Sequence, residues 1–81
     1  AAAMLERIVV APAHGIFQPA DEFRAGRAVR EGDVVGLVSS LGSVHLVECC
    51  FDGVLMGTFM RPGERVRKGQ ALGWLRSPAC A

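Results

Sequence analysis

The stretch GRAVREGDVVGLV (residues 26–38) returns without a gap as GERVRKGQALGWL (residues 63–75). Both copies read G-x-x-V-x-x-G-[DQ]-x-Φ-G-Φ-Φ, where Φ is an apolar residue. The similarity extends backward, because APAHGIF (11–17) corresponds to CCFDGVL (49–55), with a one-residue difference in spacing before the next glycine. A repeat of this kind means that one supersecondary unit occurs twice, and that neither unit buries its apolar face alone.

Each half of the repeat has the pattern of short β-strands joined by tight turns. Glycines 26 and 32, like glycines 63 and 69, bracket a connection in which positive φ costs glycine little. Val29 and Val66 are expected to fill the core between those turns. Apolar runs between the turns predict strands at Arg7–Val10, Gly15–Phe17, Val34–Val38, Val44–Val47, Val54–Met60 and Ala71–Leu75. We therefore expect an all-β fold: a flattened β-barrel, or barrel-sandwich hybrid, of two four-stranded antiparallel sheets with pseudo-two-fold symmetry.

The length of 81 residues suits one small domain. We expect this domain to span residues 4–77, with residues 1–3 as an addition before a native start at Met4 and residues 78–81 as a tail. Nine basic and eight acidic residues are interspersed, so no basic surface for nucleic acid is indicated. No apolar run approaches the roughly 20 residues of a membrane helix, and the start lacks a signal-peptide pattern. A cytoplasmic protein without nucleic-acid or membrane partners is expected.

The three cysteines, Cys49, Cys50 and Cys80, make a poor disulfide framework and fit reduced thiols. Adjacent residues of a strand face opposite sides, so at most one of Cys49 and Cys50 faces the core. A reactive thiol would need a neighbour that lowers its pKa, and the sequence shows none. The histidines, His14 and His45, lack zinc-ligand spacing relative to the cysteines, and no metal site is expected.

The large side chains are expected to fill the core, namely Phe17, Phe23, Phe51, Phe59, Trp74, Met56 and Met60. Arginines gather in or beside the two corresponding turns, at Arg24, Arg27, Arg30, Arg61, Arg65 and Arg67. Acidic neighbours dilute their charge, which predicts a mixed, solvated surface. There is no catalytic triad order, phosphate loop or pair of carboxylates, and a barrel of this size leaves little room for substrate, so an enzyme is not expected.

The ordered motifs resemble the biotinyl/lipoyl carrier domain family from Val9 to Leu75. Its members contain A-P-x-x-G, then G-x-x-V-x-x-G-[DQ]-x-[LV], a hairpin, and a second half ending in G-x-x-V-x-x-G-Q-x-L. The closer resemblance is to the biotin carboxyl carrier group of acetyl-CoA carboxylase. In bacterial carriers the stretch after A-P-x-x-G runs into a protruding thumb, and the shorter region from Gln18 to Arg24 implies that a full thumb is missing here.

The hairpin between the two halves departs from the family pattern. Biotin carriers read E-A-M-K-M-E there, with biotin on the lysine. A gap-free count from Gly32 to Gly53 aligns SSLGSV (39–44) with that hexapeptide, so Gly42 falls on the lysine and Leu41 and Ser43 fall on the flanking methionines. The lipoyl motif D-K-A is absent as well. Glycine has no amine to attack an activated acid, so neither covalent biotin nor covalent lipoate is expected.

The resemblance therefore implies a carrier-like protein that is not biotinylated, a pseudo-carrier that acts through protein contacts. Its candidate interaction residues are Ser40, Leu41, Gly42, Ser43 and His45. By resemblance, the partners would be subunits of acyl-CoA carboxylase, hence of fatty acid biosynthesis, or of a related multienzyme complex. Exposed strand edges leave room for a homo-oligomer.

Two alternatives stay open. One is a genuine group carrier modified at another residue, such as a cysteine or Lys68, the sole lysine. The simplest reading of Lys68 is nevertheless a solvated loop charge. The other is a small-molecule or metal-binding module that uses His45 and Cys49 on the same fold.

Overall fold

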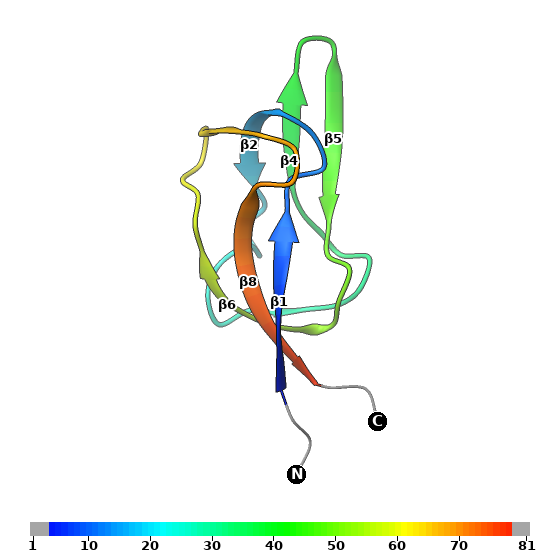
Figure 1. Cartoon of the computed structure of the whole chain (residues 1–81), viewed down its shortest axis with the longest axis vertical. Coiled ribbons are helices and arrows are strands. Elements are labelled where there is room, and N and C mark those ends of the chain that lie inside the picture. Colours follow the sequence, from blue (N-terminus) through cyan, green and yellow to red (C-terminus); the bar gives the residue numbers. More distant parts are fainter. Residues whose placement is uncertain (1–3, 79–81) are drawn as a thin grey trace.

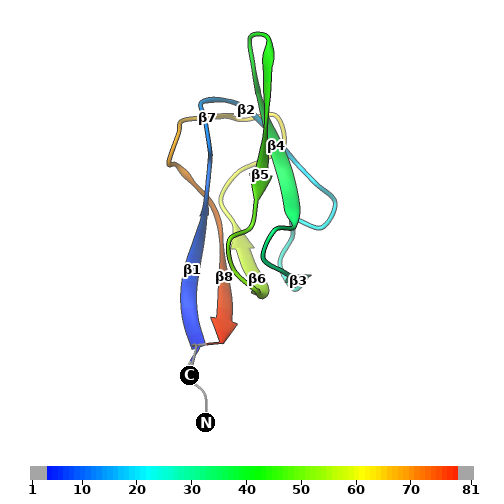
Figure 2. The ribbon, with the colours of Figure 1, turned by 90° about the vertical axis from the view of Figure 1, so that its right-hand side faces the viewer.

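The computed structural model describes residues 4–78, and this part of the chain contains eight strands and no helix. The strands are β1 (Met4–Val10), β2 (Gly15–Pro19), β3 (Ala28–Val29), β4 (Val34–Ser40), β5 (Ser43–Glu48), β6 (Gly53–Thr58), β7 (Arg65–Val66) and β8 (Ala71–Pro78). They form two antiparallel sheets of four strands, in the orders β1-β8-β6-β3 and β5-β4-β2-β7. The sheets face each other (Figures 1 and 2), and within residues 4–78 no ladder joins them. The predicted all-β architecture is confirmed, as a sandwich rather than a closed barrel.

All six predicted strands are present, and the two short strands β3 and β7 contain the predicted core valines, Val29 and Val66. The predicted strand at Val54–Met60 ends earlier, at Thr58. Strand β8 reaches Pro78, one residue into the predicted tail. The rest of that tail, Cys80 and the expected addition at residues 1–3 lie outside the described residues.

The pseudo-two-fold relation is visible in the sheet orders. Exchanging β1 to β4 with β5 to β8 converts the order β1-β8-β6-β3 into β5-β4-β2-β7. The buried core obeys the same relation, because it consists of equivalent pairs from the two halves: Val9 and Val47, Ala11 and Cys49, Phe17 and Leu55, Val29 and Val66, Val35 and Leu72, Val38 and Leu75. Phe23 completes the core, and its equivalent, Met60, packs against it. Neither half has a core of its own.

Reciprocal hydrogen bonds connect each glycine turn to the opposite half. The amide of Gly32 donates to the carbonyl of Cys49 at 2.7 Å, and the amide of Gly69 donates to the carbonyl of Ala11 at 2.8 Å. The return bonds repeat as well, from Cys49 N to Asp33 O at 2.8 Å and from Ala11 N to Gln70 O at 2.9 Å. Both glycines have positive φ, +90° and +83°. The turns of one half are thus completed by backbone groups of the other.

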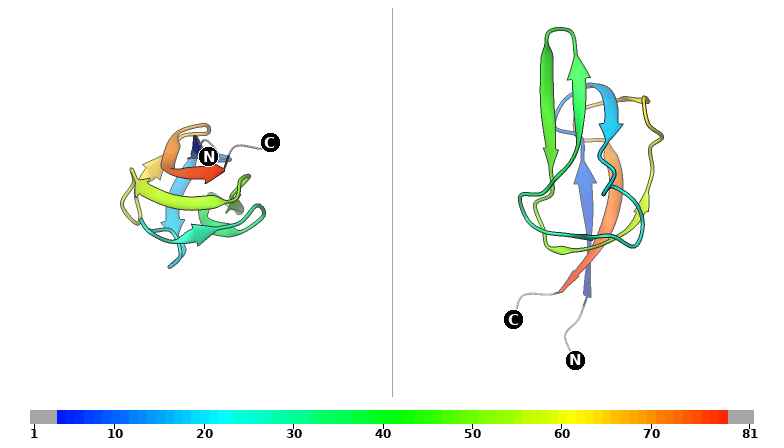
Figure 3. Two further views of the ribbon diagram at one scale, coloured as in Figure 1. Left: turned by 90° about the horizontal axis from the view of Figure 1, so that it is seen from below. Right: turned by 180° about the vertical axis from the view of Figure 1, so that it is seen from behind.

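One connection differs from the rest. Every link between successive strands passes from one sheet to the other, except the hairpin from β4 to β5. This hairpin projects beyond the body of the sandwich, and the described ends of β1 and β8 lie at the opposite end (Figures 1 and 3). Under the pseudo-two-fold relation, the β4–β5 hairpin corresponds to the pairing of β8 with β1.

Most of the predicted core side chains are confirmed. Phe17 and Phe23 are buried, and their rings meet edge to face with 5.5 Å between the ring centres. Phe51 packs against the core, and the guanidinium carbon of Arg7 lies 4.5 Å from the centre of the Phe51 ring. The prediction was wrong for Met56 and Phe59, which are exposed. Met56 lies at a register shift between Leu55 and Gly57, and Phe59 follows the end of β6.

The loop after β2, from Ala20 to Arg27, is where the two halves of the repeat differ in length. Equivalent hydrogen bonds, Ala20 N to Val35 O and Phe59 N to Leu72 O, mark where the two halves begin to diverge. The segment from Ala20 to Gly26 in the first half is two residues longer than the equivalent segment from Phe59 to Gly63 in the second half. The extra length turns inward, because Phe23 of this loop is buried in the core.

The adjacent cysteines separate as predicted, with Cys49 buried and Cys50 exposed. The Cys49 Sγ–H group donates to the carbonyl of Phe51 at 3.1 Å. Burial raises the pKa of the Cys49 thiol, and the nearby thiol and carboxylate charges act in the same direction. Cys49 is therefore a core residue in the thiol form.

Alanine at Gly15 should destabilise the chain by about 3 kcal/mol or more, because its Cβ would collide with the backbone oxygen of Ser39. Gly53→Ala should have a comparable cost, because its Cβ would collide with the backbone oxygen of Arg76. Gly26→Ala is the matched control: φ is +92° but no atom lies within 4 Å, so it should cost only about 1–2 kcal/mol. Urea unfolding measures the three losses, and equal losses would contradict the close approach of these strands.

Iodoacetamide should alkylate Cys50 in the folded protein and modify Cys49 at least about tenfold more slowly, because the Cys49 thiol is buried and protonated. Tandem mass spectrometry can assign the label to each of the two positions. Denaturant should abolish the difference, and equal rates without denaturant would show that Cys49 is not a core residue.

Candidate interaction site at the hairpin tip

The tip of the β4–β5 hairpin is a two-residue turn. Ser40 pairs with Ser43 as the last step of the ladder, which leaves Leu41 and Gly42 at the turn. Gly42 has a φ of +75°, whereas no residue other than glycine has positive φ in the described part of the chain. Negative φ followed by positive φ at the central positions matches a type II turn, which requires glycine or asparagine at the second. The sequence count that put Leu41 and Gly42 at this tip agrees with the structure.

The predicted interaction residues lie together on this hairpin. Leu41, Gly42, Ser43 and His45 are exposed, and Ser40 is half-buried. Leu41 is fully exposed, at 103% of its reference area. Burial of a leucine side chain away from water is favourable by about 1.5–3 kcal/mol. A partner that covered Leu41 would therefore gain up to this amount of binding free energy.

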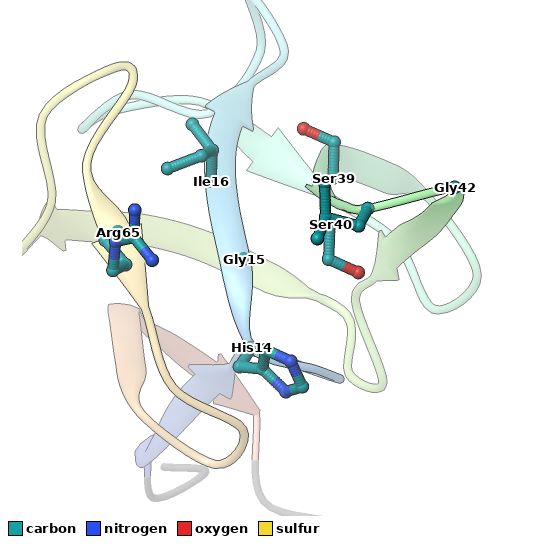
Figure 4. A pocket seen from close by; sticks show the side chains of 8 residues that line it. His14, Gly15, Ile16, Ser39, Ser40, Gly42 and Arg65 are labelled. Atoms are coloured by element: carbon teal, nitrogen blue, oxygen red, sulfur yellow. The ribbon is translucent and has the colours of Figure 1, made fainter.

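A hollow of about 690 Å³ lies beside the tip. Its lining comes from three separate segments of the chain (Figure 4): His14, Gly15, Ile16, Ser39, Ser40, Leu41, Gly42 and Arg65. Ile16 pairs with Ser39 on one side and with Arg65 on the other. Strand β2 begins at Gly15, while β4 continues to Ser40, so the outer end of the hairpin has no neighbour on this side. The hollow is the space that this difference in strand length leaves.

The chemistry of the lining is that of hydrogen-bond donors. Arg65 contributes a guanidinium, His14 an imidazole, and Ser39 and Ser40 contribute hydroxyls, whereas no carboxylate is among the lining residues. Gly15 allows the backbones of β2 and β4 to approach closely here. The sequence predicted Ser40, Leu41 and Gly42 but missed the contribution of His14 and Arg65. Only the pairing of β2 with both β4 and β7 brings these residues together, and no local motif reports it.

The residues of the other hypotheses are not brought together with this hollow. Within residues 4–78, no group of three histidine, cysteine or acidic side chains could hold a metal ion. His45 lies on the exposed part of β5, whereas the Cys49 thiol is buried and bonded to Phe51. Lys68 is exposed in the turn between β7 and β8. No helix in the described residues has the length and apolar character to cross a membrane.

No family model matches the chain, and no curated protein matches it in sequence. Solved structures with the same fold include the urea carboxylase of Kluyveromyces lactis, with a TM-score of 0.75 and 18% identity over 88% of this chain and 6% of that protein. A succinylglutamate desuccinylase/aspartoacylase of Rhodobacter sphaeroides matches with a TM-score of 0.74 and 24% identity over 96% of this chain and 25% of that protein.

An aspartoacylase family protein of Mesorhizobium loti matches with a TM-score of 0.72 and 22% identity over 91% of this chain and 24% of that protein. At these identities the likeness concerns the fold. The chain therefore has the fold of a module found within a carboxylase and within aspartoacylase-type proteins, and it spans a quarter or less of each of them.

Proposed function

We propose that this chain is a carrier-like module without a covalent cofactor, which acts by docking its hairpin tip on a protein partner. The observation that carries the proposal is the composition of the tip. The position of the carrier lysine is occupied by Gly42, and the residue beside it is a fully exposed leucine. Such a tip offers a small apolar contact and no amine.

Carboxylase subunits, of acyl-CoA carboxylase or a related multienzyme complex, are the partners we favour. The likeness to one segment of a carboxylase supports this choice, and so does the resemblance of the repeat motifs to biotin carriers. The module itself is non-catalytic in this proposal, and its unlinked thiols at Cys49 and Cys50 suit the cytoplasm.

The shape of the turn supports the loss of the attachment function. A residue other than glycine at position 42 would adopt positive φ, at a cost of about 1–2 kcal/mol. No atom lies within 4 Å of a Cβ at this position, so a longer side chain would extend into solvent without a clash. A lysine is thus accommodated sterically here but is disfavoured by the backbone, which makes its reintroduction a feasible test.

The likeness to aspartoacylase-type proteins favours a second candidate. In this second candidate function, the hairpin tip docks on an aspartoacylase-type enzyme instead of a carboxylase. Identification of the captured protein separates the two candidates.

The unmodified chain should keep its bare mass after expression in its own host with a biotin-accepting control protein. Replacement of residues 39–44 by E-A-M-K-M-E should produce a biotinylated protein, because the hairpin holds position 42 at an exposed two-residue turn. Intact-mass spectrometry reads both results. Biotin or lipoate on the unmodified chain, at Lys68 or at a cysteine, would establish the group-carrier alternative and refute the pseudo-carrier.

The Leu41→Ser variant should lose at least about tenfold in affinity for the captured partner, because it removes the largest exposed apolar group of the tip. Quantitative pull-down from the native host measures this loss, and thermal unfolding should show unchanged stability. Val34→Ser is the matched control, since Val34 is an exposed apolar residue at the opposite end of β4. Equal capture by both variants, or capture without any carboxylase or aspartoacylase-type protein, would contradict the proposal.

A further inference from the structure

The two ends of the sandwich have equivalent backbones but a different balance of charge. The charged or polar positions related by the repeat are Glu64 and Arg27, Arg65 and Ala28, Arg67 and Arg30, Lys68 and Glu31, Gln70 and Asp33, and His14 and Asp52. The first member of each pair lies at the end that carries the hairpin tip, and the second lies at the far end (Figures 1 and 2). Among these positions the tip end thus has three basic side chains, a histidine and one carboxylate, whereas the far end has two arginines and three carboxylates.

Each of the two arginine-bearing turns is mixed in charge, as predicted, but the turns lie at opposite ends of the sandwich and do not form one continuous surface. The acidic residue of the tip-end turn is Glu64, whose carboxylate accepts a hydrogen bond from the amide of Arg61 at 3.1 Å. Arg65, Arg67 and Lys68 are all exposed. Their charges are available to an external partner.

The cations adjoin the hollow beside the tip. A second hollow of about 450 Å³, lined by His14, Gly15, Arg65, Val66, Arg67 and Gln70, shares His14, Gly15 and Arg65 with the first. Donor groups therefore continue from Ser39 and Ser40, past Arg65, to Arg67. The corresponding corner at the far end is lined by Glu31 and Asp52 together with Arg7, Cys50, Phe51, Ser77 and Pro78.

We propose that the tip end receives an acidic segment of the protein partner. One carboxylate enters the hollow and accepts hydrogen bonds from Arg65 and the serine hydroxyls, while further carboxylates meet Arg67 and Lys68. Leu41 packs against an apolar residue beside that segment. This inference rests on the proposed docking function and names the chemistry of the partner that the tip recognises.

An acidic segment fits these groups better than a small anion does. The cations are spread over β7 and the following turn, so one small anion could contact only part of the set. An extended segment could contact all of them, and charge-assisted hydrogen bonds would give it orientation as well as affinity. The exposed leucine has no role in binding a small anion.

The internal repeat supplies variants that the fold already accommodates. Ala28 stands at the position equivalent to Arg65, and Glu31 stands at the position equivalent to Lys68. Arg65→Ala and Lys68→Glu therefore introduce residues that the same backbone carries in the other half. Arg30→Ala is the matched control, because it removes an arginine from the equivalent turn at the far end.

The experiment is a titration of the isotope-labelled full chain with a hexaglutamate peptide, followed by NMR amide shifts. We expect shifts at residues 14–16, 39–43 and 65–70, and a loss of at least about tenfold in affinity for the Arg65→Ala/Lys68→Glu variant. The Arg30→Ala variant should bind within about twofold of the unmodified chain. Raising the ionic strength from about 0.01 M to about 1 M, which shortens the Debye length from about 30 to about 3 Å, should abolish the shifts.

Absence of shifts at low salt, shifts at another surface, or equal binding by the double variant would overturn the inference. Inorganic phosphate and glutarate serve as small-anion controls, and equal affinity for them would indicate an anion site instead of a peptide site. If hexaglutamate fails while Leu41→Ser still lowers partner capture, only the acidic partner is refuted. If the chain proves to be biotinylated while hexaglutamate binds as expected, the pseudo-carrier is refuted and the acidic partner is retained.

Discussion

The reciprocal bonding of the glycine turns is the constraint on which the rest of the structure depends. Gly32 is held by the carbonyl of Cys49 and Gly69 by the carbonyl of Ala11, so each half closes the turn of the other. The buried side chains repeat this arrangement, because every core residue has its equivalent in or against the same core. A chain of this size buries a limited fraction of its surface, and interlocking two small units gives it one continuous core that neither could form alone. The two-residue turn of the hairpin, Leu41 and Gly42, is outside this arrangement and contributes nothing to the core.

The fold was predictable because the signals that specify it are local and occur twice. Glycine spacing predicted the turns, and short apolar runs between them predicted the strands. The repeat then required that the strands be shared between two equivalent sheets. The predictions that failed depend on pairing details: Met56 is exposed because the ladder shifts register between Leu55 and Gly57, and such a shift has no marker in the sequence. Phe59 is apolar but follows the end of its strand, so composition alone misplaced it.

The candidate site was only partly predictable, for a related reason. The hairpin residues were found because the count from Gly32 to Gly53 lies within one continuous segment. His14 and Arg65 are distant in sequence and reach the same hollow only because β2 pairs with β4 on one side and with β7 on the other. The charges illustrate the same limit. The sequence predicted a mixed, solvated surface at the arginine-bearing turns but did not show that the pseudo-two-fold relation places these turns at opposite ends of the molecule.

A repeated fold makes its two ends alike in backbone, so any difference in function between them must come from side chains and chain connectivity. Connectivity makes one end a continuous hairpin and the other end the pairing of β1 with β8. Side chains then give the hairpin end its exposed leucine and an excess of basic groups, and give the other end an excess of carboxylates. Met4 and Pro78, the paired described ends of β1 and β8, lie opposite to the tip. The repeat thus gives two ends with one backbone plan, and connectivity makes only one of them a projecting turn.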